Sequence, residues 1–131
     1  MQQKFILDLE SARRVAAAAQ AEADKNSWNV SIAIVDDGGH LMYLQRDKVQ
    51  LGSIDVSIEK ARAAAMFRRS TQIWEEIVNG DRPGYMALPG MMPLEGGLPL
   101  LYQGQVIGAI GVSGVKSTED GLVAQAGASA L

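Results

Sequence analysis

Cysteine is absent from this 131-residue chain, and histidine occurs only once, at His40. The absence of cysteine excludes disulfides, iron–sulfur clusters, thiolate metal sites and cysteine nucleophiles. A lone histidine without cysteine cannot build a structural zinc site, and any Ser-His-Asp triad would have to use His40. The sequence therefore predicts no metal site built from its own side chains.

Aromatic residues and positive charge are also scarce. Aromatics make up 5% of the chain, and 15 acidic residues against 12 basic ones give a net charge of −3. Nucleic-acid-binding domains usually carry a basic patch and stacking aromatics, so we expect no nucleic-acid partner. No apolar run approaches the roughly 18 residues of a membrane span, and Asp8 and Glu10 interrupt the apolar N-terminal stretch, unlike a signal peptide. We expect no membrane association and a cytoplasmic location.

Apolar residues are plentiful, at 47%, which predicts one folded domain over residues 1–131. Helical and strand periodicities alternate along the chain, whereas residues 81–97 hold three prolines and four glycines and are expected to form a long ordered loop. The expected helices are 8–26 with Asp8 as N-cap, 53–67, 118–130 and a short helix after Ser70 or Thr71. Two hairpins are expected, formed by strands 28–35 with 40–44 and 98–102 with 105–112. This order predicts an α+β fold with helices packed on an antiparallel sheet.

Helical spacing assigns a buried face to two of the helices. The residues expected to face the sheet are Ile54, Ile58, Ala61 and Ala65 in helix 53–67, and Leu122, Val123 and Ala126 in helix 118–130. Lys60 then lies at the edge of a buried face. Gly108 and Gly111 interrupt an apolar strand, which indicates that another segment approaches its backbone closely.

His40 and Met91 are the first candidate functional residues. His40 follows a predicted Asp-Asp-Gly-Gly hairpin turn at residues 36–39, so it is either a solvated side chain or an iron ligand or acid–base group. Met91 belongs to a methionine cluster in the long loop that either packs the loop onto the sheet or lines an apolar pocket.

A second group of candidates combines basic residues with a loop carboxylate. Lys60 and Arg62 form either a solvated helix face or an anion site for a carboxylate or for haem propionates. Glu95 precedes Gly96–Gly97 and is either a general acid–base or an ordinary loop carboxylate paired with a neighbour.

Four ordered blocks of sequence, together with Asp120 and residues 124–127, cover nearly the whole chain. They are residues 31–41 (SIAIVDDGGHL), 52–55 (GSID) with 60–64 (KARAA), 88–90 (LPG) with 93–99 (PLEGGLP), and Gly104 with 106–114 (VIGAIGVSG). In their order and spacing they resemble the GlcG/HbpS family of haem-binding or haem-degrading domains.

The resemblance implies a profilin-like fold in which helices cover both faces of a five-stranded antiparallel sheet. The fifth strand would be short and lie near Tyr85–Leu88. The resemblance also implies a homo-oligomer, from tetramer to octamer, and binding of a small molecule, with haem or a related tetrapyrrole as the candidate cofactor. The candidate cofactor-binding residues are His40, Lys60, Arg62, Met91, Gly96 and Gly97.

Two other functions remain open. One is a small enzyme of organic-acid or aromatic catabolism, such as an isomerase, tautomerase or deaminase. In that case Lys60 or Arg62 would hold a substrate carboxylate, and Glu95 or His40 would be the catalytic proton carrier. The other is a non-catalytic, oligomeric regulatory subunit.

Overall fold

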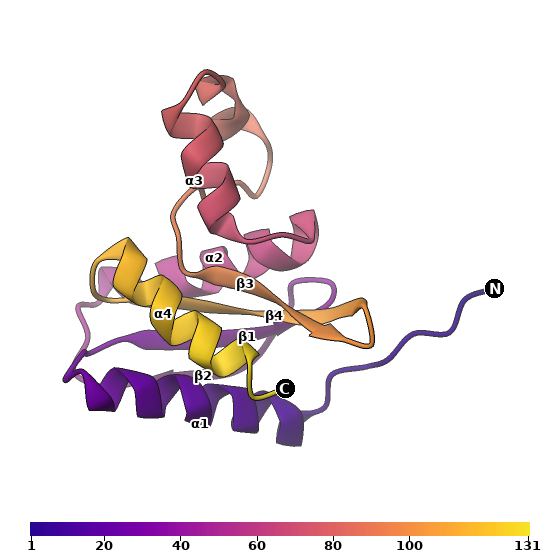
Figure 1. Cartoon of the computed structure of the whole chain (residues 1–131), viewed down its shortest axis with the longest axis vertical. Coiled ribbons are helices and arrows are strands. Elements are labelled where there is room, and N and C mark those ends of the chain that lie inside the picture. The colour runs from indigo at the N-terminus through magenta and orange to yellow at the C-terminus, as the bar shows by residue number, and fades with distance from the viewer.

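The computed structural model describes residues 1–131 and contains one four-stranded antiparallel sheet between two layers of helices (Figure 1). The elements are α1 (Leu9–Lys25), β1 (Ser31–Asp36), β2 (Leu41–Arg46), α2 (Gly52–Phe67), α3 (Thr71–Asn79), the 3₁₀ helix η1 (Pro83–Ala87), β3 (Gly97–Tyr102), β4 (Gln105–Ser113) and α4 (Ser117–Ala128). The strand order β2-β1-β4-β3 joins the two hairpins through β1 and β4. The predicted antiparallel α+β architecture is confirmed, and none of the helices has the length and apolar character needed to cross a membrane.

The prediction of a fifth strand is wrong. Residues 85–88, where it was expected, belong largely to η1 and pair with no strand. Pro83 starts this helical turn, where its fixed φ suits a helix and its missing N–H leaves no intrahelical hydrogen bond unmade.

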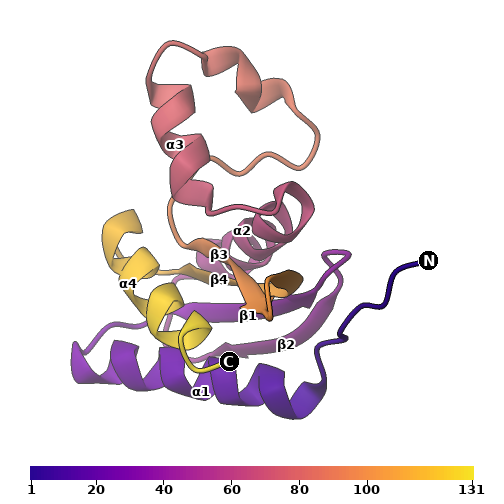
Figure 2. The same cartoon turned by 45° about the vertical axis from the view of Figure 1, so that its right-hand side comes forward.

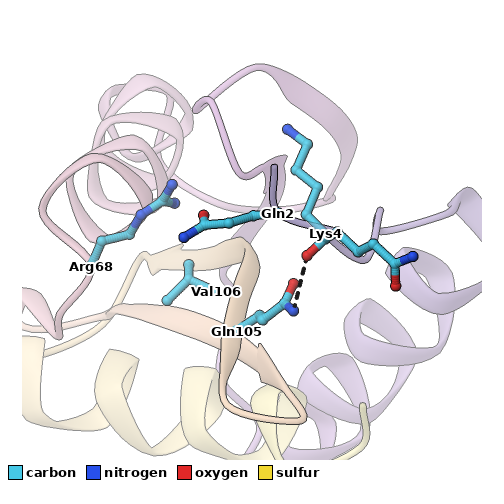
Figure 3. Close-up of a pocket in the computed structure, with 6 residues that line it drawn as sticks. Gln2, Lys4, Arg68, Gln105 and Val106 are labelled. Carbon is cyan, nitrogen blue, oxygen red and sulfur yellow. Dashed lines mark hydrogen bonds between the residues drawn. The ribbon is translucent and has the colours of Figure 1, made fainter.

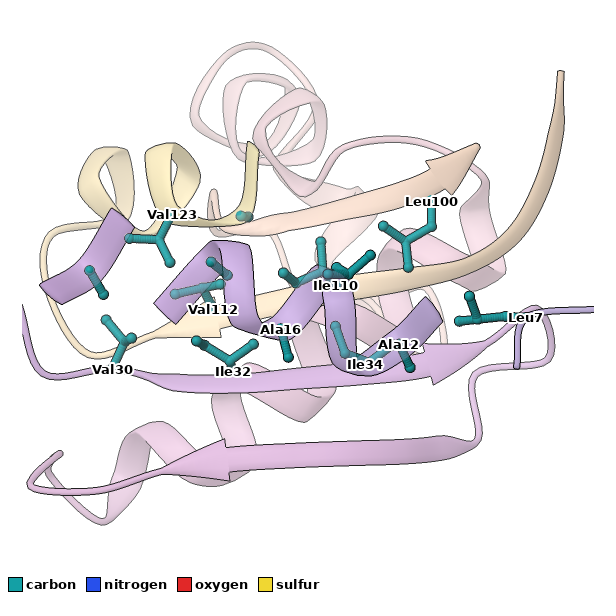
Figure 4. Packing of buried hydrophobic residues seen from close by; sticks show 14 of the residues in the cluster. Leu7, Ala12, Ala16, Val30, Ile32, Ile34, Leu100, Ile110, Val112 and Val123 are labelled. Atoms are coloured by element: carbon teal, nitrogen blue, oxygen red, sulfur yellow. The ribbon is translucent and has the colours of Figure 1, made fainter. Parts of the chain in front are cut away.

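The larger core lies where α1 and α4 pack on one face of the sheet (Figure 2). Asp8 caps α1 as predicted, because its carboxylate accepts the Ser11 N–H at 2.8 Å. The side chains labelled in Figure 4 include Ala12 and Ala16 of α1, Val123 of α4, and Ile32, Ile34, Ile110 and Val112 of the sheet. On β1, Ile32 and Ile34 belong to this core, whereas Ala33 and Val35 belong to a smaller core on the opposite face. Both faces of this strand are therefore covered, as predicted.

The opposite face of the sheet is covered by α2, whose inward side matches the predicted one at Ala61 and Ala65 but not at Ile54. Its buried residues are Ser53, Ser57, Lys60, Ala61, Ala63, Ala64 and Ala65, whereas Ile54 and Ile58 are only partly buried. A Cβ added at Gly111 would collide with the Ser57 carbonyl oxygen and the Ala61 nitrogen. The predicted close approach at this glycine is confirmed. It places small residues against the sheet, with Ile58 packed at the edge of this smaller core.

The inward face of α4 also differs from expectation. Val123 is buried as predicted, but Leu122 is 58% exposed and Ala126 is only partly buried. Asp120 occupies the inward position one turn earlier. The orientation of α4 is therefore set by a buried carboxylate, with an exposed leucine beside it.

Residues 71–96, which we call the arm, project from the body of the molecule (Figures 1 and 2). The arm comprises α3, η1 and the loop that leads to β3. Its two ends meet at Thr71, a fully buried residue whose Oγ1 accepts the Gly97 N–H at 2.9 Å and donates to the Gly97 carbonyl at 3.4 Å. Ser70 caps α3 by accepting the Gln72 N–H at 3.1 Å, and α3 begins where a short helix was predicted.

Candidate functional site

The predicted site residues divide between two regions. Lys60, Glu95 and Gly96–Gly97 meet where the arm joins the body. His40 and Arg62 lie at the β1–β2 turn, where a Cβ added at Gly39 would be 3.8 Å from the Arg62 Cβ. Met91 lines none of the cavities described below.

Lys60 is inside the protein, with only 2% of its surface exposed. Its Nζ donates to Asp120 Oδ2 and to the Val112 carbonyl, both at 3.0 Å. Asp120 Oδ1 accepts the Val115 N–H at 3.1 Å. Burial raises the pKa of Asp120, and the Lys60 charge and the Val115 N–H oppose that shift. The pair ties α2 to the end of β4 and the start of α4.

Gly96 lets the loop lie directly on this ion pair. Its φ is +132°, and an added Cβ would be 2.9 Å from Lys60 Nζ and 3.1 Å from Asp120 Cβ. At Gly97 an added Cβ would strike the Lys60 carbonyl. Both glycines therefore act as spacers above α2 and set the position of Glu95.

Glu95 lines a cavity of about 210 Å³ between the arm, the start of β3 and α4. The lining residues are Ser70, Gln72, Glu95, Gly96, Leu98, Gly121, Leu122 and Gln125. The Glu95 side chain lies against Gly121, where an added Cβ would overlap its Oε2, Cδ and Cγ. A residue without a side chain at position 121 is therefore needed for the observed placement of this carboxyl.

The surroundings of Glu95 disfavour its charged form. Burial raises the pKa of this carboxyl, and the neighbouring carboxylates of Glu75 and Glu76 raise it further. Lys60 acts in the opposite direction, but its ammonium is already bound to Asp120. Glu75 also accepts the Glu95 backbone N–H at 2.9 Å, so two carboxylates are held close together.

His40 sits at the other region, with 82% of its side chain exposed. Its Nδ1 lies 3.2 Å from Asp36 Oδ1, and the same oxygen accepts the backbone N–H groups of Gly38 and His40 at 2.9 Å. Burial alone would raise the pKa of Asp36, but these N–H groups and the imidazole lower it overall. The carboxylate therefore orients the ring and leaves Nε2 facing outward.

Two cations and a methionine surround His40. A recess of about 470 Å³ is lined by Lys4, Asp36, Asp37, Gly38, His40, Met66 and Arg68. Lys4 Nζ lies 3.1 Å from Asp37 Oδ2, and Arg68 donates to the Asp37 carbonyl at 2.9 Å. Lys4 and Arg68 also border a neighbouring recess of about 700 Å³, seen in Figure 3 beside Gln105. A ligand placed over the imidazole would therefore meet two positive side chains.

Sequence reasoning missed Asp120 as the partner of Lys60, and it missed the role of Asp36. For Asp120 a signal was present, because it shares helical spacing with Val123, Ala124 and Gly127, all of which are buried. A carboxylate in an apolar stripe requires a buried partner.

A sequence profile described as haem degrading protein HbpS-like matches residues 7–129. The chain belongs to the HbpS-like family. Protein GlcG of Escherichia coli strain K12 is 48% identical over 114 residues, which cover 86% of this chain and 85% of that protein. The predicted family is thus confirmed.

Solved structures of HbpS-like proteins agree with the fold. A double mutant of HbpS from Streptomyces reticuli superposes with a TM-score of 0.91 at 32% identity and covers 100% of this chain and 90% of its own. A PduOC:heme complex superposes with a TM-score of 0.87 at 24% identity, over 97% of this chain and 96% of that chain. At that identity the second match supports the fold alone.

Proposed function

We propose that this chain is a small-ligand-binding protein and that His40 is the axial ligand for haem or a related tetrapyrrole. The observation that carries the proposal is the Asp36–His40 pair. A carboxylate on Nδ1 fixes the tautomer and the orientation of the ring, as in many histidines that bind metals. Nε2 is the nitrogen that faces outward, and one protein ligand is sufficient to hold a haem iron.

The size of the recess and the two cations among its lining residues, which also include Asp36 and Asp37, support the same ligand class. Its volume of about 470 Å³ lies within the roughly 300–1,000 Å³ of pockets for drug-sized ligands, whereas the Glu95 cavity of about 210 Å³ is too small. Lys4 and Arg68 would pair with the propionates, in place of the predicted Lys60 and Arg62. Bound haem would supply an iron centre for redox chemistry or for binding a further small molecule.

Titration of the full chain with hemin, followed by the Soret band, tests this proposal. We expect a saturable Soret shift with the unmodified chain, its loss in His40→Ala, and an affinity roughly 10–100-fold lower in Asp36→Asn, a typical effect of losing such a partner. Glu95→Gln is the matched control at the other cavity and should leave the titration unchanged. An unaltered Soret shift in His40→Ala would rule out the proposed ligand.

A second candidate function, proton transfer by a small enzyme, is favoured by the raised pKa of Glu95. A carboxyl that is protonated at higher pH than usual is better suited to act as a general acid or base near neutrality. Lys60 is engaged by Asp120 and Arg62 lies at the other region, so neither would anchor a substrate carboxylate here. Turnover of a candidate substrate that persists in Glu95→Gln would exclude this role.

A further inference from the structure

We infer that the Glu95 cavity binds a small organic cation, with an ammonium group on the Glu95 carboxylate and a short apolar or hydroxylated chain along the opposite wall. This inference deepens the second candidate function, because it names the class of molecule that Glu95 would meet.

The charge around the cavity is one-sided. Glu95 is part of its lining, and the Glu75 carboxylate is bound to the Glu95 backbone N–H beside it. No lysine or arginine lines the cavity. Lys60 lies behind Gly96, and its ammonium donates hydrogen bonds to Asp120 and to the Val112 carbonyl. An anionic ligand would therefore face carboxylates without a free counter-charge, whereas a cation would relieve their repulsion.

The rest of the lining suits a short, partly polar molecule. Gln72, Gln125 and Ser70 offer neutral groups that both donate and accept hydrogen bonds. Leu98 and Leu122 offer apolar surface, and the outward position of Leu122 is explained if its side chain forms a wall of this site.

The volume of about 210 Å³ limits the ligand to a compound smaller than ordinary drug-sized ligands. Three probes of closely similar size separate the effect of ligand charge from that of ligand size. They are ethanolamine, which is a cation, glycolate, which is an anion, and ethylene glycol, which is neutral. Each carries a hydroxyl on two carbons, and they differ in having an ammonium, a carboxylate or a second hydroxyl. Binding is read from backbone amide signals of the ¹⁵N-labelled full chain.

We expect ethanolamine to shift the amide signals of Glu95, Gly96 and Gly121 saturably, and glycolate to leave them in place. Glu95→Gln should weaken ethanolamine binding about tenfold or more, as loss of a charge-assisted hydrogen bond does. Glu76→Gln is the matched control, because Glu76 is exposed and outside the lining, and its effect should stay under about threefold.

Gly121→Ala gives a variant that keeps every charge. The added methyl group would displace the Glu95 side chain, while alanine favours the helix more than glycine does. We expect this variant to stay folded and to bind ethanolamine more weakly. Equal binding of glycolate, no saturable shift with ethanolamine, or undiminished binding in Glu95→Gln would each overturn the inference.

Binding and turnover are separate results in this design. Saturable ethanolamine binding without turnover of any amine would support the inference and count against the second candidate function. Failure of ethanolamine to bind would overturn the inference alone, since proton transfer by Glu95 does not require a cationic substrate.

Discussion

Substitution of Lys60 by methionine tests how much the fold depends on the buried ion pair. Methionine keeps the length and apolar stem of the side chain but leaves the 2%-exposed Asp120 without its counter-charge. Removing one partner of such a pair costs about 3–5 kcal/mol. Unfolding entropy of about 2.1 cal/mol/K per residue, over 131 residues, converts this loss into a Tm lowered by about 11–18 °C.

The assay is thermal and urea unfolding followed by circular dichroism. Arg62→Met is the matched control on the same helix, since its pair with Glu59 spans 3.5 Å and its side chain is 55% exposed. Exposed pairs contribute about 0.2–1 kcal/mol, so this control should lose less than about 1 kcal/mol.

The pH dependence gives a second readout. In Lys60→Met the unpaired Asp120 has a folded-state pKa above its unfolded value, so folding takes up a proton. The destabilisation is then greatest above the folded-state pKa and shrinks as pH falls through it. In the Lys60→Met background, Asp120→Asn should lower the unfolding free energy by less than the same substitution does in the unmodified chain. An effect of Lys60→Met no larger than that of Arg62→Met would refute the reasoning.

Two further predictions concern the backbone and the first helix. Gly111→Ala should lower the unfolding free energy by about 3 kcal/mol or more, because the new Cβ would collide with the backbone of α2. Gly52→Ala is the control and should not be destabilising, because its Cβ would have no atom within 4 Å. Urea unfolding measures both variants. Asp8→Ala should cost about 1 kcal/mol through loss of the N-cap, while Asp24→Ala on the same helix should cost less, and equal losses would contradict the capping role.

Features that depend on neighbouring residues in the sequence were predictable. The Asp8 cap, the start of α3 after Ser70 and the turn before His40 each follow from a few adjacent residues. The two hairpins were located for the same reason, since their strands are joined by short turns.

Features that depend on residues far apart in the sequence could not be predicted from it. The isoleucines of α2 are less buried than expected, because the closest contact is made at Gly111, which lies on a strand far along the chain. Lys60 was placed at the edge of the buried face since its partner, Asp120, is 60 residues away. The split between the His40 and Glu95 regions likewise depends on which residues of α2 the turn and the loop contact, and helical spacing alone cannot predict those contacts.

The two hydrogen bonds between Thr71 and Gly97 have a consequence for how the sequence of the arm can vary. Because the arm leaves and rejoins the body at one closed point, residues between the two ends can change in length or sequence while the sheet keeps its register. Glu75 and Glu95 belong to this exchangeable segment, whereas Lys60 and Asp120 belong to the body. A change in the arm would therefore alter the acidic wall of the Glu95 cavity, while the wall formed by Gly121, Leu122 and Gln125 of α4 would stay in place.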